Sequence, residues 1–428
     1  MTLICFKSNG TSPSFEDTRT TGFSNFKDVF YNFFLPDELT QLVKSNEKEQ
    51  EKCSVQRGDV FLTRTSETMD DLGMSSVARK DYPNATFNGF TKRLRPKPES
   101  PAHPEFVAYF LRSPHFRNEM LAFSTMSTRA SLNNDMISRL RIKLPPLPEQ
   151  KVIAQILGSL DDKIELNRRM NATLEGLAQA LFQSWFVDFD PVLDNALVAG
   201  NPIPDELTDR AAIRRQALDN GTANREAAQH FPATFQFTEE LGWIPEGWEI
   251  QKAENIVQRH KVSKKFTKKN VSKEGDVPVF DQGSGLILGY SDAPADINSS
   301  KELPNFIFGD HTCITHISLK PFSVGPNVIP LSAEFYDAYW TFYAIKDLQD
   351  FQEYRRHWME FKIKEVLVPS EKLAVQFGDH VREFYKSIEL NSETSSTLTK
   401  LRDTLLPQLI SGELRIPNAA KLVECSLL

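Results

Sequence analysis

The sequence predicts an α+β fold in which two mixed α/β domains are separated by two long antiparallel helices. These helices are expected to form a coiled coil that relates the two halves by a pseudo-twofold axis. Three observations lead to this prediction: an internal repeat, a helical seam in each copy of it, and a β-rich segment before each seam. The chain has 428 residues, a length that favours more than one domain.

The repeat has an offset of 224 residues. Ile-Glu-Leu-Asn at Ile164–Asn167 recurs without change at Ile388–Asn391. The same offset matches Leu174 with Leu398, Leu177 with Leu401, Leu181 with Leu405 and Pro145 with Pro369. So many matches in one register indicate an internal duplication rather than chance.

Both copies of the repeat carry the pattern of a long helix. Apolar or small polar residues alternate at spacings of three and four, which is typical of a coiled-coil seam. Asn167 and Asn391 occupy equivalent seam positions, where a polar side chain costs stability but disfavours wrong registers. We therefore expect the helices to pair with each other. The predicted seam residues are Leu160, Ile164, Asn167, Leu174, Leu181, Ile388, Asn391, Leu398 and Leu405.

The segments before the seams have short β-rich runs bounded by turn residues. Strands are predicted within Gly58–Thr65, Leu140–Leu144, Gly275–Phe280, Asn305–Asp310 and Ile363–Val368, and aromatic helices within Phe106–Leu111 and Tyr336–Tyr343. The aromatic stripes are interpreted as core. The predicted boundaries are 1–145 for the first domain, 146–190 for the first long helix, 191–240 for an acidic connector, 241–369 for the second domain, 370–414 for the second long helix and 415–428 for a tail.

The net charge of −7 hides segregated charge. The segment Gln251–Lys273 carries eight basic residues and one acidic residue, whereas the connector before it is acidic. A lysine-rich stretch can simply be a solvated face, but clustered Lys and Arg also neutralise phosphates. The residues predicted to bind DNA are Arg64, Thr65, Lys92, Arg93, Arg95, Lys261, Lys264, Lys265, Lys268, Lys269, Arg355 and Arg356.

Motifs for catalysis are missing from the sequence. It contains no phosphate-binding loop, no metal-type spacing of histidines and no Cys-x-x-Cys pair, so no catalytic or metal-binding residue is predicted. The four scattered cysteines are expected to be free thiols in a reducing cytoplasm. No apolar run is long enough to span a membrane, and no signal peptide is expected. These features leave two hypotheses open: a DNA-recognition protein, and a coiled-coil scaffold whose globular ends bind other proteins.

The sequence resembles the specificity subunits of type I restriction–modification systems. The resemblance rests on Leu144–Gln150, Leu181–Pro191, Leu241–Glu249, Leu401–Leu414 and Gly58–Thr65. The first of these, Leu-Pro-Pro-Leu-Pro-Glu-Gln, and the closing Leu401–Leu414 motif are the most specific. The family usually opens with a tryptophan-containing segment, and this chain has no counterpart of it before Thr11. We therefore expect the first domain to be truncated at its N-terminus.

The resemblance implies a non-catalytic, cytoplasmic subunit that serves DNA methylation and host defence. Its two globular domains would be target-recognition domains on one bipartite, asymmetric site in double-stranded DNA. Its helices would set the gap between the half-sites and dock two DNA-methyltransferase subunits, and two motor–endonuclease subunits would join for restriction. S-adenosylmethionine, ATP and magnesium would then belong to those partners, with no cofactor on this chain and no membrane contact.

Overall fold

The computed structural model describes residues 19–66, 71–122, 130–283 and 285–416. The chain divides into two compact units, and each long helix passes from one unit to the other. Unit 1 comprises Met1–Leu166 and Thr394–Leu428, and unit 2 comprises Asn167–Glu393. In the described ranges, no helix is long and apolar enough to cross a membrane.

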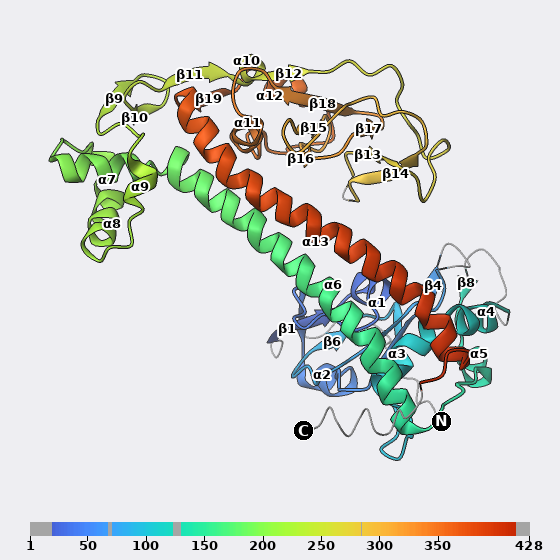
Figure 1. Ribbon diagram of the computed structural model, residues 1–428. Helices are drawn as coiled ribbons and strands as arrows, with labels where there is room; N and C mark the ends of the chain where they lie inside the picture. The colour runs from blue at the N-terminus through green and yellow to red at the C-terminus, as the bar shows by residue number, and fades with distance from the viewer. Residues whose placement is uncertain (1–18, 67–70, 123–129, 284, 417–428) are drawn as a thin grey trace. The chain divides into compact units, whose positions relative to one another are not determined.

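Unit 1 is built on two small three-stranded sheets (Figure 1). One has the order β2-β1-β6, with β1 at Arg19–Ser24, β2 at Leu42–Ser45 and β6 at Thr86–Phe87. The other has the order β5-β3-β7, with β3 at Val60–Thr63, β5 at Ser75–Val77 and β7 at Thr91–Leu94. The remaining elements are α1 (Phe26–Tyr31), α2 (Glu47–Lys52), β4 (Thr65–Ser66), α3 (Pro104–Arg112), α4 (Pro114–Ala122), β8 (Ala130–Ser131) and α5 (Asn134–Arg139).

The predicted aromatic helix of unit 1 is confirmed as α3 and forms its core. Every residue of Phe106–Leu111 is buried, and α3 packs against β5 of the second sheet. The predicted strand at Gly58–Thr65 is confirmed as β3 and β4. Gly58 precedes them with a φ of +87°, a left-handed conformation that a glycine adopts without strain.

Unit 2 has a four-stranded sheet, β12-β18-β15-β16, and a three-stranded sheet, β14-β13-β17. Their strands are β12 (Val257–Arg259), β13 (Val277–Phe280), β14 (Ile287–Ser291), β15 (Asn305–Gly309), β16 (Thr315–Ser318), β17 (Ser323–Val324) and β18 (Val328–Ala333). A separate pair joins β11 (Glu249–Lys252) to β19 (Glu365–Val368). The helices of this part are α10 (Ala253–Ile256), α11 (Ala338–Ile345) and α12 (Trp358–Phe361). These elements confirm the strands and the aromatic helix predicted for the second half.

The duplication extends to strand pairing. In unit 1, β1 pairs antiparallel with β2 and parallel with β6, and in unit 2, β13 pairs antiparallel with β14 and parallel with β17. Likewise β3 lies between β5 and β7, and β15 lies between β16 and β18, all antiparallel. The two globular halves therefore repeat one strand topology, although the sequence match is confined to the helices and the residues beside them.

The prediction of a strand at Leu140–Leu144 is wrong. The repeat offset places Ile142 and Leu144 at the positions of Val366 and Val368 in β19, whose partner strand is β11. The described part of unit 1 has no counterpart of β11, and a strand without a partner leaves its backbone groups unpaired. The segment keeps only the alternation of a strand: Ile142 and Leu144 pack against the core and line an apolar cavity, while Arg141 and Lys143 are exposed.

The two long helices are antiparallel, as predicted. α6 covers Leu147–Phe182 and continues as a π-helical turn over Gln183–Val187, and α13 covers Glu371–Ser411. In unit 2, the buried Asn167 donates its side-chain N–H to the backbone oxygen of Asn391 at 3.3 Å, and Asn391 donates to Oδ1 of Asn171 at 2.9 Å. In unit 1, Arg402 of α13 pairs with Asp161 of α6 at 2.6 Å.

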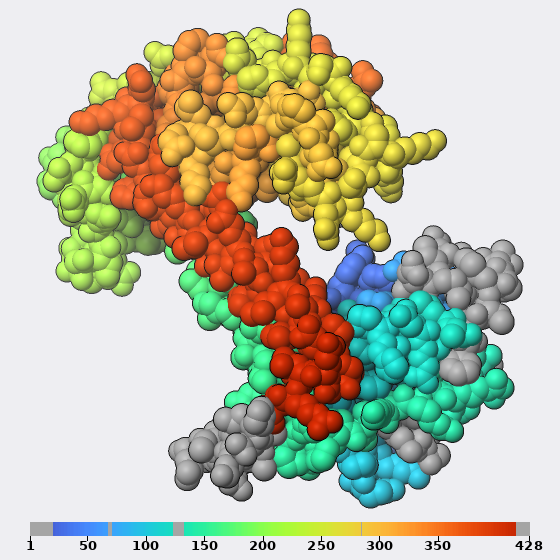
Figure 2. All heavy atoms as spheres, turned by 45° about the vertical axis from the view of Figure 1, so that its right-hand side comes forward, coloured from blue at the N-terminus to red at the C-terminus, as the bar shows by residue number. Residues whose placement is uncertain are grey.

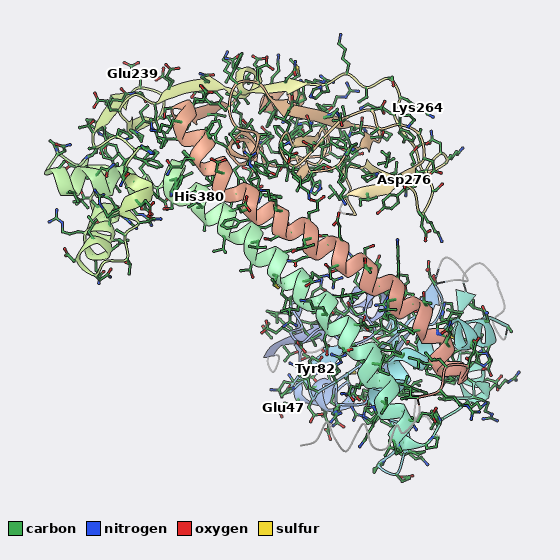
Figure 3. The ribbon with its side chains drawn as sticks, in the orientation of Figure 1. Glu47, Tyr82, Glu239, Lys264, Asp276 and His380 are labelled. Atoms are coloured by element: carbon green, nitrogen blue, oxygen red, sulfur yellow. The ribbon has the colours of Figure 1, made fainter. Side chains whose placement is uncertain are left out.

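The seam side chains are buried to different extents. Leu181 and Ile388 pack against the core of unit 2, and Leu405 packs against the core of unit 1. The side chains of Leu160, Ile164, Leu174 and Leu398 are half-buried. His380 of α13, labelled in Figure 3, lies edge-on to the Trp185 ring at 5.7 Å. α13 continues through Pro407, which lies in its last turns, where few further backbone hydrogen bonds are lost.

The predicted acidic connector after α6 is folded largely into helices. It contains α7 (Asp190–Ala199), the short η2 (Asp205–Leu207), α8 (Thr208–Asp219) and α9 (Arg225–Ala228), followed by a hairpin of β9 (Phe235–Thr238) and β10 (Gly242–Pro245). Arg210 and Arg214 of α8 each grip one carboxylate of α7 through two hydrogen bonds, Arg210 on Asp190 and Arg214 on Asp194, at 2.7–2.9 Å. Two of the acidic side chains, Asp190 and Asp194, are therefore buried and compensated, whereas the acidic residues from Asp205 to Glu240 are exposed.

Candidate nucleic-acid interface

The lysine-rich segment of unit 2 is a surface loop between β12 and β13. Lys261, Lys264, Lys268 and Lys269 are exposed, and the yellow atoms of this region lie on the outer surface of the unit in Figure 2. The loop is anchored by Phe266, which is buried and whose N–H donates to Val324 O at 3.1 Å. Lys264, labelled in Figure 3, lies with its Nζ 5.0 Å from the Phe266 ring. The result is a backbone fixed at one point that presents several mobile ammonium groups to solvent.

A second basic feature forms around the buried carboxylate of Asp310, where three cations from distant segments meet. Lys265 donates to Val328 O at 3.0 Å, next to the β15–β18 pairing that ends at Gly309. Burial, together with the nearby charges of Arg259 and Arg356, lowers the pKa of Lys265. Arg356 lies 3.8 Å from Asp310, and Arg259 lies over the Trp358 ring at 5.3 Å. We call Arg259, Lys265, Arg356 and Asp310 the Asp310 cluster.

The two arginines at 355–356 have different surroundings. Arg355 is paired with Glu360 and with Glu353, and its hydrogen bond to Glu360 raises its pKa. The side chain of Arg356 is 79% exposed, and its 3.8 Å contact with Asp310 is longer than a hydrogen bond. Arg356 is therefore the one of the two whose guanidinium faces solvent. DNA contact by either residue stays a prediction.

The basic residues predicted in unit 1 are mostly used within the fold. Arg93 is buried against the Phe87 ring and donates to Ser54 O. Arg95 donates to both carboxylate oxygens of the buried Asp59 at 2.7 and 2.6 Å, and this hydrogen bonding raises its pKa. Lys92 donates to Asn134 Oδ1 at 2.7 Å. These contacts hold β7 in place, so DNA contact by Arg93 or Arg95 stays a prediction that requires them to break.

Arg64 and Thr65 lie where β3 passes into β4, and both are half-buried. The backbone of Arg64 is bonded on both sides, to Phe90 O at 2.8 Å and from Leu132 N at 2.9 Å. This junction is rigid and partly open to solvent. It is the part of the first half where the predicted DNA contacts remain compatible with the observed hydrogen bonds.

The histidines do not form a metal site among the described residues, and no group of three metal-ligating side chains is found there. His357 is fully buried and donates through Nε2 to Glu353 O at 3.0 Å. His316 packs on the Phe280 ring at 5.0 Å, and burial lowers its pKa from 6.5 to about 4. Cys53 and Cys313 are free thiols, as expected.

The low pKa of His316 predicts an acid-sensitive unit 2. The unfolded chain takes up this proton near its ordinary pKa of 6.5, whereas the folded unit resists it until about pH 4. Stability is therefore lost as the pH falls through this window, by up to about 3 kcal/mol from this group. Hydrogen exchange, measured in increasing urea at pH 7 and at pH 4.5, gives the free energy of unfolding of unit 2 at each pH. The difference between the two values is the loss. The His316→Phe variant should lose less over the same interval, and an equal loss would contradict the assignment.

Three residues of this surface were not predicted from the sequence. Arg259 belongs to the basic segment but was not among the predicted DNA contacts. Its guanidinium joins this surface because it lies over the Trp358 ring. Tyr354 is 72% exposed, and His311 lies against its ring at 4.8 Å. In the sequence, the adjacent pair Arg355-Arg356 was the feature that indicated a basic loop at this position. The sequence had no indication that it would meet Asp310.

Comparison with known proteins shows which proteins this chain is similar to. Residues 4–176 match the family model described as a type I restriction modification DNA specificity domain. The HindI specificity subunit of a type I restriction enzyme from Haemophilus influenzae is 28% identical, with 92% of this chain and 94% of that protein covered. The chain is similar to type I restriction–modification specificity subunits over most of its length. The resemblance inferred from the motifs is thereby confirmed.

Other specificity subunits show the same extent of similarity. The MjaIX specificity subunit of Methanocaldococcus jannaschii is 23% identical, over 86% of this chain and 81% of that protein. Among solved structures, the type I S subunit from M. genitalium has 15% sequence identity, covers 95% of this chain and 93% of its own, and gives a TM-score of 0.48. The matches to HindI and MjaIX thus cover most of this chain.

Proposed function

We propose that this specificity subunit recognises a bipartite, asymmetric sequence in double-stranded DNA, with one half-site for each globular half. The observation that carries the proposal is the repetition of one strand topology in two halves, each attached to a helix of the same duplicated register. Two similar modules suit two half-sites at a defined spacing. The exposed lysine loop and the Asp310 cluster of unit 2 supply the positive charge that phosphates require.

Assembly with catalytic partners completes this proposal. The duplicated helices offer similar surfaces twice, which suits docking of two copies of one methyltransferase subunit. Two motor–endonuclease subunits would then join for restriction. The chemistry would lie with these partners, and they would bring S-adenosylmethionine, ATP and magnesium. The specificity subunit itself would be non-catalytic and would supply the recognition surface and the spacing between the half-sites.

Co-expression with a type I DNA-methyltransferase subunit tests this function. We expect a complex with two methyltransferase subunits for each specificity subunit and, in a host without other methylation, modification of one split motif. Exchanging residues 245–369 for those of a relative should change one half of the motif and leave the other half and the gap unchanged. A chain that binds no methyltransferase at any salt concentration would instead favour the coiled-coil scaffold.

A further inference from the structure

The loop before α12 presents aromatic and basic side chains to solvent. Phe351 is 55% exposed, Tyr354 is 72% exposed and the side chain of Arg356 is 79% exposed. Large exposed aromatic groups next to a cation are more informative than isolated exposed residues, because they are costly in water and suit contact with bases. This loop is therefore a different kind of surface from the lysine loop, whose exposed charges are ammonium groups.

The backbone of the loop is held in place by several hydrogen bonds. His357 donates its ring N–H to Glu353 O at 3.0 Å and its backbone N–H to Asp310 O at 2.8 Å. Trp358 N donates to Asp310 Oδ1 at 3.0 Å, and Arg355 is held by Glu353 and Glu360. Tyr354 and Arg356 are thus carried on a braced backbone. A preorganised loop loses little conformational entropy when it binds.

The adjacent turn between β15 and β16 contains polar atoms without partners. Both ring nitrogens of His311, and the hydroxyl of Thr312, are buried and make no hydrogen bond within the described chain. The His311 backbone is fixed, because its N–H donates to Gln282 Oε1 at 2.9 Å. Its ring lies edge-on to Tyr354 at 4.8 Å. The His311 ring thus packs beside Tyr354 and limits the positions that the Tyr354 ring can take.

We propose that Arg356 and Tyr354 contact bases in the half-site bound by unit 2, whereas Lys261, Lys264, Lys268 and Lys269 contact phosphates. The inference rests on the proposed function and specifies how its second half works. The guanidinium of Arg356 can fork onto the two acceptors of a guanine edge in the major groove. Tyr354 supplies an apolar face for a neighbouring base, and the His311 ring supports that face from the side. Lysine ammonium groups lack the fork and fix position rather than sequence.

Methylome sequencing separates the two roles. The wild-type chain and its variants are co-expressed with the methyltransferase, and the methylated motif is read for each. The Arg356→Gln variant should relax one guanine position in one half-site, so that preference for guanine there falls roughly tenfold or more, while the other half-site and the gap stay unchanged. Arg356→Lys keeps the charge but loses the fork, and it should relax the same position. The paired change Lys268→Gln and Lys269→Gln should lower the methylated fraction at every site and leave the motif intact.

The outcomes are distinct. Arg215→Gln, at an exposed arginine of α8, is the matched control and should change neither motif nor extent. An unaltered motif in Arg356→Gln and in Tyr354→Ala, with methylation retained, overturns the base-reading assignment while the proposed function stands. A changed motif in the lysine variant overturns the division of roles. Absence of any split motif with the wild-type chain overturns the proposed function, and this inference with it.

Discussion

Neutralising three lysines of the β12–β13 loop should weaken DNA binding more than any other surface change. Lys264, Lys268 and Lys269 are exposed, whereas the ammonium group of Lys265 is bonded to Val328 O and is left intact. If each of the three lysines releases one counterion, their replacement by glutamine reduces the slope of log affinity against log salt by about 2.7. At roughly 0.1 M salt this corresponds to a loss of several hundredfold on any duplex sequence.

The measurement is a salt titration of duplex binding by the purified complex. Glutamine at Lys163, Lys372 and Lys400, three exposed positions on the long helices, gives a control with the same change in net charge. The control should shift affinity only slightly. If both triple variants weaken binding equally, the effect is one of overall charge. If the loop variant keeps the wild-type salt slope, the loop makes no phosphate contacts.

Removing Asp194 should have the largest effect on stability. Its carboxylate is almost fully buried and receives two hydrogen bonds from Arg214, at 2.9 and 2.7 Å. Asp194→Ala leaves the arginine charge in a largely buried position without its partner. Loss of one member of a buried pair typically costs about 3–5 kcal/mol. We expect the α7–α8 region to open first, because this pair and the Asp190–Arg210 pair hold the two helices together.

Hydrogen exchange of α7 and α8 is the suitable measurement, because a protein of two units does not unfold as a single two-state system. The double variant Asp194→Leu with Arg214→Leu should recover most of the lost protection, since neither charge is then left buried. Asp209→Ala, at an exposed position of α8, serves as the control and should be nearly silent. Protection that is unchanged in Asp194→Ala would show that packing alone holds these helices.

Local patterns were enough for the elements whose type is set by the spacing of their own apolar and turn residues. The seams of α6 and α13, the strands at β3, β13 and β15, and the aromatic helices α3 and α11 were predicted from periodicity and turn residues. The strand expected at Leu140–Leu144 failed because a strand also needs a partner, which periodicity does not report. A count of charges in the acidic segment did not show which arginine meets which carboxylate, because the pairs Arg210–Asp190 and Arg214–Asp194 form only when α7 and α8 pack together.

The sequence by itself determined the duplicated helices, their antiparallel seam with Asn167 and Asn391, and the resemblance to type I specificity subunits. These features follow from the spacing of residues along the chain, because seam residues recur every three or four positions. Only the tertiary structure decided which basic residues are free to meet DNA. It buried Arg93, tied Arg95 to Asp59, and brought Arg259, Lys265 and Arg356 together around Asp310. The physical reason is that the sequence shows each charged residue. Whether that residue is paired or exposed depends on side chains from distant segments of the chain.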